Sequence, residues 1–184
     1  MLKKLTSLQR FVLKGVVLLV LWQVVYSLML EPKGTIDYPL TKLVSEGAAS
    51  TLRTFGISSS CEPIPHHSDL KMQGEYLIIN EVRSVGVGNS CNGLEVMALF
   101  IGFLLIVPGN WQRKTGYMFF GLALIYGANV VRVILLGYNY MENPQTFEFN
   151  HKYTYKIAVY AVVFLLWVLW VEKLSGLKWK KSAD

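Results

Sequence analysis

Four long apolar stretches divide the chain. They cover residues 11–30, 92–107, 117–138 and 155–171. A helix needs ~20 mostly apolar residues to cross about 30 Å of hydrocarbon, and within lipid every backbone polar group must be paired inside its own segment. The pattern therefore predicts an all-α integral membrane protein, in which a four-transmembrane-helix bundle makes residues 1–184 a single membrane domain.

The longest stretch outside these spans, residues 31–90, is predicted to form an extracytoplasmic segment. In its first half, apolar residues recur at helical spacing and predict an amphipathic helix on the outer leaflet. A turn-rich stretch follows at residues 58–69. Residues 74–90 are rich in Ile, Val and Tyr, which predicts a small β-hairpin that caps the outer mouth of the bundle. The apolar positions of the expected helix are Leu40, Leu43, Val44, Ala48, Leu52 and Phe55.

Basic residues beside the spans predict the orientation. Short flanks rich in Lys and Arg stay in the cytoplasm, and four spans bring the three basic flanks to one side. We therefore expect a multi-pass protein of the cytoplasmic (inner) membrane, with both termini inside and residues 31–90 and 139–154 outside. No small-x-small cleavage site follows the first apolar stretch, so we expect a retained anchor. The basic residues are Lys3, Lys4, Arg10, Lys14, Arg113, Lys114, Lys173, Lys178, Lys180 and Lys181.

Composition narrows the class of protein further. Of the 184 residues, 53% are apolar and only 16% are charged, whereas ordinary soluble domains have about 25% charged residues. The net charge of +6 comes from residues that flank apolar stretches and form no surface stripe. Membrane lipid is therefore an expected partner and nucleic acid is not. Two cysteines, Cys61 and Cys91, are too few for a disulfide scaffold.

Three residues with complementary chemistry are expected to meet at the outer boundary of the membrane. Cys91 lies where the outer segment becomes the second span. Arg132 lies six residues before Tyr138 in the third span, which is roughly 9 Å below the outward end. His151 lies in the expected short outer loop before the fourth span. A thiol, a guanidinium and an imidazole from three different spans thus converge on one face.

This combination of groups suits nucleophilic acyl transfer. A free thiol has a pKa of about 8.5, so a neighbouring imidazole such as His151 is needed to take the proton of Cys91. A fixed cation such as Arg132 stabilises the oxyanion that develops on an attacked carbonyl. Inserting an arginine into a membrane span costs ~2.5 kcal/mol or more of free energy, so Arg132 is expected to have a functional role.

Each of these residues also has a structural interpretation that stays open. In it, Arg132 snorkels to the outer interface, Cys91 is a small buried apolar residue and His151 is solvated in a polar loop. Asn129, three residues before Arg132 on the same helical face, is either its partner or a helix-packing amide. Glu95, one turn into the second span, either pairs with Arg132 or stays protonated.

The motifs around these positions resemble the exosortase/archaeosortase family of membrane-embedded cysteine transpeptidases. Residues 90–94 read SCNGL, residues 129–132 read NVVR, and His151 follows. They match the family's Cys-x-Gly element, with Gly93 as its glycine, its Asn-x-x-Arg element and its downstream histidine, over about residues 85–171. Asn92 stands where the family usually has a small residue, often Ser, and many relatives have more than four spans.

The resemblance implies a function and a role for each matched residue. Cys91 is the acylated nucleophile, His151 its base and later its acid, and Arg132 stabilises the oxyanion or the substrate. The substrates are secreted proteins whose carboxyl-terminal signal combines a short motif, a hydrophobic helix and a basic cluster. Cleavage at the outer face passes the new carboxyl end to an acceptor, which the sequence does not name, or to water. We expect no cofactor.

Two functions of other classes stay open as alternatives. One is a four-helix thiol-disulfide membrane protein that uses Cys61 and Cys91, although the sequence has no Cys-x-x-Cys pair. The other is a non-enzymatic membrane assembly subunit whose polar residues hold helices together. A metal site formed by Cys61, His66 and His67 is disfavoured, because no further ligand has suitable spacing.

Overall fold

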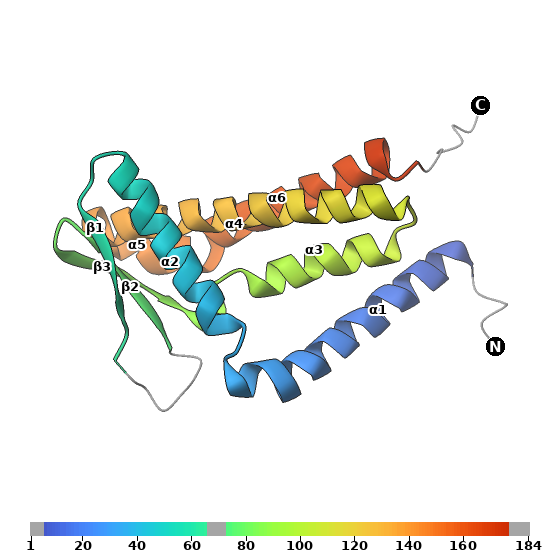
Figure 1. The fold of residues 1–184 in the computed structure, drawn as a ribbon, viewed down its shortest axis with the longest axis horizontal. Coiled ribbons are helices and arrows are strands. Elements are labelled where there is room, and N and C mark those ends of the chain that lie inside the picture. Colours follow the sequence, from blue (N-terminus) through green and yellow to red (C-terminus); the bar gives the residue numbers. More distant parts are fainter. Residues whose placement is uncertain (1–5, 66–72, 177–184) are drawn as a thin grey trace.

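The computed structural model describes residues 6–65 and 73–176 (Figure 1). Six α-helices and one three-stranded sheet occur in this part of the chain. The helices are α1 (Ser7–Val25), α2 (Asp37–Thr54), α3 (Leu94–Ile106), α4 (Trp111–Glu142), α5 (Pro144–Phe149) and α6 (Tyr155–Leu169). The strands are β1 (Ser59–Pro63), β2 (Gly74–Ile79) and β3 (Val82–Gly88).

Three helical stretches are long and apolar enough to cross a membrane. They are Gln9–Leu30, Trp111–Glu142 and Pro144–Leu174. The first joins α1 to the π-helical turn Tyr26–Leu30, and the third joins α5 and α6 through a second π-helical turn. The expected second span is the apolar helix α3, which has only 13 residues and is therefore about 20 Å long. A membrane crossing by α3 stays a prediction.

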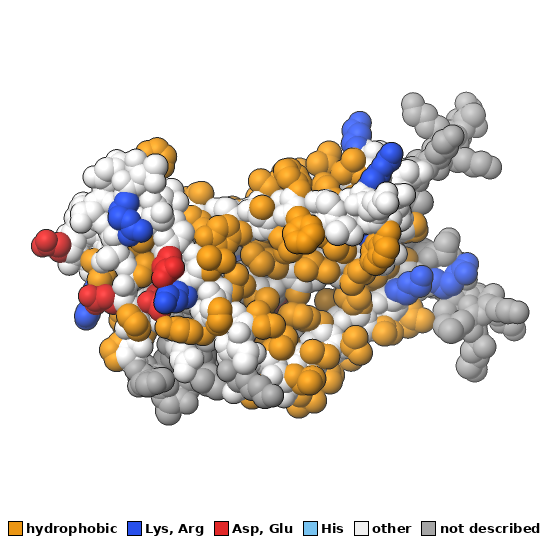
Figure 2. All heavy atoms as spheres, in the orientation of Figure 1, with side chains coloured by type: hydrophobic (Ala, Val, Ile, Leu, Met, Phe, Trp, Pro, Cys, Tyr) orange, Lys and Arg blue, Asp and Glu red, His pale blue; other side chains and the backbone are white. Residues whose placement is uncertain are grey.

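The ends of the helices are arranged as the charge pattern requires. The start of α1, the α3–α4 turn and the end of α6 lie at one end of the molecule, while α2, α5 and the sheet lie at the other (Figure 1). Lys and Arg side chains gather at the first end (Figure 2). That this end faces the cytoplasm stays a prediction. Of the basic residues used for it, Lys3, Lys4, Lys178, Lys180 and Lys181 lie outside the described residues.

The sheet is antiparallel, with the order β1-β2-β3. Asn80 and Glu81 join β2 to β3 and both have positive φ, 49° and 67°, as the commonest two-residue hairpin turn requires. The hairpin expected within residues 74–90 is thus present, and its action as a cap stays a prediction. The expectation of turns is wrong for residues 59–63, because β1 pairs with β2 there and Cys61 lies opposite Leu77. Residues 66–69 of the expected turn-rich stretch lie outside the described residues.

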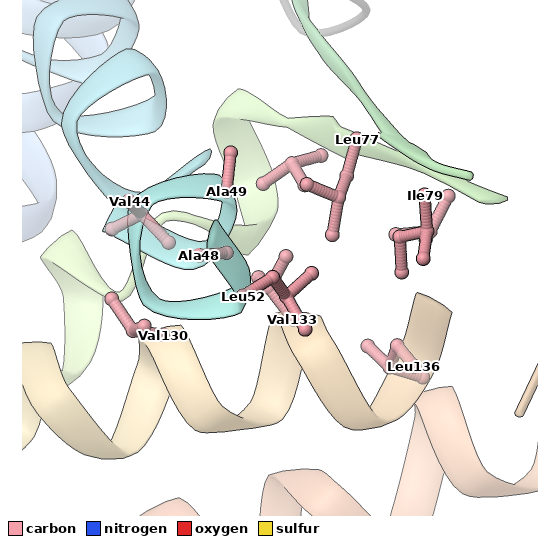
Figure 3. Close-up of a cluster of buried hydrophobic side chains, with 11 residues drawn as sticks. Val44, Ala48, Ala49, Leu52, Leu77, Ile79, Val130, Val133 and Leu136 are labelled. Atoms are coloured by element: carbon pink, nitrogen blue, oxygen red, sulfur yellow. The ribbon is translucent and has the colours of Figure 1, made fainter. Parts of the chain in front are cut away.

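Helix α2 packs on protein, which corrects the expectation that its apolar face lies on the outer leaflet. This face lies between the sheet and α4 (Figure 3). Two of the six expected apolar positions, Leu43 and Phe55, point outward and are 53% and 78% exposed. The helix joins the sheet to the bundle through one apolar core, made of Val44, Ala48, Ala49, Leu52, Leu77, Ile79, Val85, Val87, Val130, Val133 and Leu136.

A second core holds α3, α4 and α6 together. Phe100 and Leu104 of α3 are fully buried against Ile125 of α4 and Val163 of α6. A Cβ at Gly121 of α4 would collide with the ring of Phe100, so the glycine allows α3 to approach closely. Because α3 is fixed on α4 in this way, the residues just before α3 keep a defined position beside the middle of α4.

The connection before the last helix differs from the expected loop. Helix α4 continues to Glu142, and the next helical stretch starts at Pro144. A proline fits the first turn of a helix, where its missing N–H has no partner to lose. His151 therefore lies in the π-helical turn Asn150–Thr154 inside a continuous helix, and its predicted place in a short loop is wrong.

Candidate active site

Cys91 lies in a turn between the sheet and the bundle. Strand β3 ends at Gly88, and a 3₁₀ turn, Asn89–Cys91, leads to the start of α3 at Leu94. The side-chain oxygen of Asn92 accepts a hydrogen bond from the Leu94 N–H at 2.9 Å and so pairs one of the free donors at the helix start. The turn holds the half-buried Cys91 thiol just outside the first turn of α3.

Gly93 is required by the backbone and by its neighbour. Its φ is +85°, a conformation that side chains with a Cβ rarely adopt. A Cβ at this position would also lie 3.2 Å from Nδ2 of Asn129. The glycine of the Cys-x-Gly element therefore lets the chain turn into α3 while the Asn129 amide stays close to the Cys91 turn.

His151 is the nearest titratable partner of Cys91. Its Nε2 lies 3.3 Å from the Cys91 Sγ. The imidazole stacks on Phe147, with ring centroids 5.7 Å apart and planes 7° apart. The π-helical turn that carries His151 contains the extra residue typical of such turns, which are frequent at functional sites. The ring is thus positioned to exchange a proton with the thiol.

Arg132 approaches the same sulfur from α4. Its Nη2 lies 3.8 Å from the Cys91 Sγ, and its Nη1 donates to Oδ1 of Asn129 at 3.2 Å. Asn129 in turn donates from Nδ2 to the main-chain oxygen of Cys91 at 3.1 Å. Arg132 is only 8% exposed. Asn129 therefore joins the turn that carries Cys91 to the guanidinium of Arg132, so it is more than a helix-packing amide.

The electrostatic surroundings favour the thiolate of Cys91. Burial alone would raise the pKa of this thiol. The hydrogen bond with His151 and the charge of Arg132 outweigh burial, and the pKa of Cys91 falls from 9.0 to about 7. A thiol with such a pKa is about half ionised at neutral pH, as a cysteine nucleophile requires.

None of the remaining candidate groups within the described residues forms an ion pair or a disulfide with the site. Glu95 is exposed on α3, and no ion pair joins it to Arg132 among the described residues. Both cysteines are free. No group of three or more His, Cys, Asp or Glu side chains suits a metal ion in the described part of the chain. His66 and His67, weighed as metal ligands, lie outside it.

The sequence did not reveal the polar residues that hold the turn at residues 89–92, which carries Cys91. Asp37, at the start of α2, accepts a hydrogen bond from Asn92, which is itself buried. Thr41, one turn later, contacts Asn89. The pairs are 55 and 48 residues apart, so no local pattern reveals them. The one available signal was Asn92, a large amide where the family usually has a small residue.

The match to a family model covers nearly the whole chain. The model described as Transmembrane exosortase (Exosortase_EpsH) matches residues 5–172. The chain belongs to the exosortase family. It is a multi-pass membrane protein, and membership indicates in general terms a transpeptidase or sorting-related role. No curated protein and no solved structure matches this exosortase. The catalytic role of each site residue stays a prediction.

Proposed function

We propose that this exosortase is a membrane cysteine endopeptidase and transpeptidase that cleaves the carboxyl-terminal sorting signal of secreted proteins at the outer face of the cytoplasmic membrane. One observation carries the proposal: the Cys91 Sγ lies 3.3 Å from Nε2 of His151 and 3.8 Å from Nη2 of Arg132. These groups can serve as nucleophile, base and oxyanion-stabilising cation in acyl transfer through a thioester.

The first half of the proposed reaction forms an acyl-enzyme. His151 takes the proton of the Cys91 thiol, and the thiolate attacks the scissile carbonyl carbon of the substrate. The carbonyl oxygen becomes an oxyanion beside the guanidinium of Arg132. When the carbon–nitrogen bond breaks, the imidazolium of His151 gives its proton to the departing amine. The carboxyl-terminal signal leaves, and a thioester to Cys91 remains.

The second half of the reaction reverses these steps with a new nucleophile. An acceptor amine or water attacks the thioester, and His151 removes the proton that this nucleophile loses. The tetrahedral intermediate collapses, an amide or a carboxylate forms, and the thiolate of Cys91 is restored. Its half-ionised state suits both steps, because a thiol with a pKa near 7 attacks and leaves readily at neutral pH.

The charge of Arg132 supports its proposed role. The guanidinium is nearly buried, and no carboxylate forms an ion pair with it in the described ranges. Its Nε is buried without a hydrogen-bond partner there. Because water screens a buried charge only weakly, its attraction to a nearby negative charge is stronger than at the surface. Arg132 is therefore well suited to stabilise first the thiolate and then the oxyanion.

Processing of a designed substrate in cells tests the proposal. The substrate is a secreted reporter with a short motif, a hydrophobic helix and a basic cluster at its carboxyl end, taken from a protein encoded beside an exosortase. The expected result is cleavage by the wild type and a decrease of at least ~1,000-fold for Cys91→Ala, because no other thiolate replaces the nucleophile.

The matched control is Cys61→Ala, which removes the other cysteine and should leave cleavage within about twofold of the wild type. Membrane levels of both variants are compared by immunoblot. Normal cleavage by Cys91→Ala would end the proposal. Loss of cleavage in both cysteine variants would contradict the assignment of Cys91 as the one thiol that the reaction needs.

A further inference from the structure

A buried polar cluster contacts Asn89 and Asn92, on either side of Ser90 and Cys91. Its centre is Asp37, the first residue of α2, which is 2% exposed. The Asn92 amide nitrogen lies 3.1 Å from both the Oδ1 and the main-chain oxygen of Asp37. The Tyr26 hydroxyl donates to the same Oδ1 at 3.3 Å. Asp37 thus joins the end of the first long helix to the residue after Cys91.

Thr41 extends the cluster to the other side of the turn. Its hydroxyl lies 2.8 Å from the main-chain oxygen of Asp37 and 2.8 Å from Oδ1 of Asn89. Asn89 and Asn92 flank the two residues Ser90 and Cys91. The first two turns of α2 therefore hold the turn that carries Cys91 at both ends, and Asn129 holds its middle through the main-chain oxygen of Cys91.

The free-energy cost of burying Asp37 indicates that this residue does more than fill space in the core. A buried carboxylate is costly unless hydrogen bonds compensate it, and an apolar pair of similar volume is often as stable. Asp37 and Asn92 are both 2% exposed and are joined by two hydrogen bonds. Their directed hydrogen bonds fix the path of the backbone at Cys91, which apolar contacts do less well.

We propose that Asp37 is a positioning residue, which acts through Asn92 to hold the Cys91 sulfur within reach of His151 and Arg132. The consequence for turnover rests on the proposed function. A misplacement of about 1 Å at a reacting atom costs on the order of 100-fold in rate. The contact with Asp37 thereby explains why this chain has a large amide, Asn92, where the family usually has a small residue.

Alkylation of Cys91 by iodoacetamide, followed by mass spectrometry across pH, tests the positioning without any substrate. In Asp37→Ala the sulfur loses its fixed distance to His151 and Arg132. The midpoint of the alkylation profile should then move from about 7 toward the ~8.5 of a free thiol. Processing of the reporter should fall about 100-fold. A merely structural role would lower protein levels and leave the midpoint unchanged.

Two further variants separate positioning from folding. Asp37→Asn keeps an acceptor oxygen for Asn92 and Tyr26 and should restore most of the wild-type profile. Ser45→Ala, the matched control on α2, removes a fully buried hydroxyl whose one hydrogen bond within the described part of the chain goes to the main-chain oxygen of Thr41. It should leave the profile unchanged. If Asp37→Ala does not accumulate in the membrane, Asn92→Ala removes both bonds to Asp37 from the other side, together with the acceptor of the Leu94 N–H.

A wild-type midpoint in membrane-inserted Asp37→Ala or Asn92→Ala overturns the inference. Failure of the proposed function has a different signature, because the wild type would then leave the reporter uncleaved while the alkylation midpoint still depended on Asp37. The two readouts therefore test the two proposals independently.

Discussion

Cys61 and Cys91 are both free and half-buried, one on β1 and the other in the turn after β3. Burial raises the pKa of each thiol. For Cys61 the charges of Glu75 and Glu46 act in the same direction, and the pKa rises from 9.0 to about 11. For Cys91 the neighbours act against burial, and the pKa falls to about 7.

An arginine near the sulfur does not explain this difference. Arg53 lowers the pKa of Cys61, as Arg132 lowers that of Cys91. However, Arg53 lies beside β1, where it donates to the main-chain oxygen of Ser59. Among the described residues, only Cys91 has a hydrogen bond with a histidine. The comparison teaches that an imidazole at hydrogen-bonding distance, added to a cation, makes the reactive thiol.

The two thiols should differ about 100-fold in their rate of alkylation at pH 7. Their thiolate fractions differ by about 5,000-fold, and the greater intrinsic nucleophilicity of the more basic thiolate offsets about 60-fold of this. Access does not explain the difference, because Cys61 lines an open cavity of about 400 Å³. Peptide mapping after brief exposure to iodoacetamide measures both rates in one sample. Equal rates at pH 7 would contradict the assigned surroundings.

His151→Ala should make Cys91 behave more like Cys61. Without the imidazole, burial is no longer outweighed, and the pKa of Cys91 should rise beyond the ~8.5 of a free thiol. Since thiolate forms as pH rises through the pKa, alkylation at pH 7 should fall at least ~3-fold, while the rate at pH 10 should not fall. The pH profile of Cys91 alkylation measures both effects.

Arg53→Gln is the control for this variant, because it removes a cation near Cys61 and leaves the surroundings of Cys91 intact. It should leave the Cys91 profile unchanged. An unaltered midpoint in His151→Ala would assign the low pKa to another group, with Arg132 the next cause in order.

The sequence was a better guide to which side chains lie together than to the local structure that carries them. Span order and charge placed Cys91, Arg132 and His151 on one side, and the three-residue spacing placed Asn129 beside Arg132. These inferences depend only on helix periodicity and topology. The structure brings the four side chains together, although it carries His151 on a helix. The Asn143–Pro144 pair was a signal for that helix start.

Features that depend on contacts distant in sequence could not be predicted. Strand β1 has turn-forming residues and forms because β2 pairs with it. Asp37 begins a helix and resembles an ordinary acidic residue of a first turn until its contact with Asn92 is known. The amphipathic pattern of α2 predicted an apolar face correctly, but periodicity does not distinguish burial against protein from burial in lipid.

Glu75→Gln should bring the pKa of Cys61 slightly closer to the pKa of Cys91. Gln keeps an oxygen for the Tyr38 hydroxyl, which donates to Glu75 at 2.8 Å, and removes only the negative charge. Because burial is the larger cause of the high pKa of Cys61, this pKa should fall by less than ~1 unit, and alkylation at pH 9 should rise at most ~3-fold. Glu62→Gln is the matched control, since Glu62 is exposed, pairs with Arg83 and is not among the causes of the high pKa of Cys61. A fall of the pKa of Cys61 to about that of Cys91 would show that charge, and not burial, causes the difference between the two pKa values.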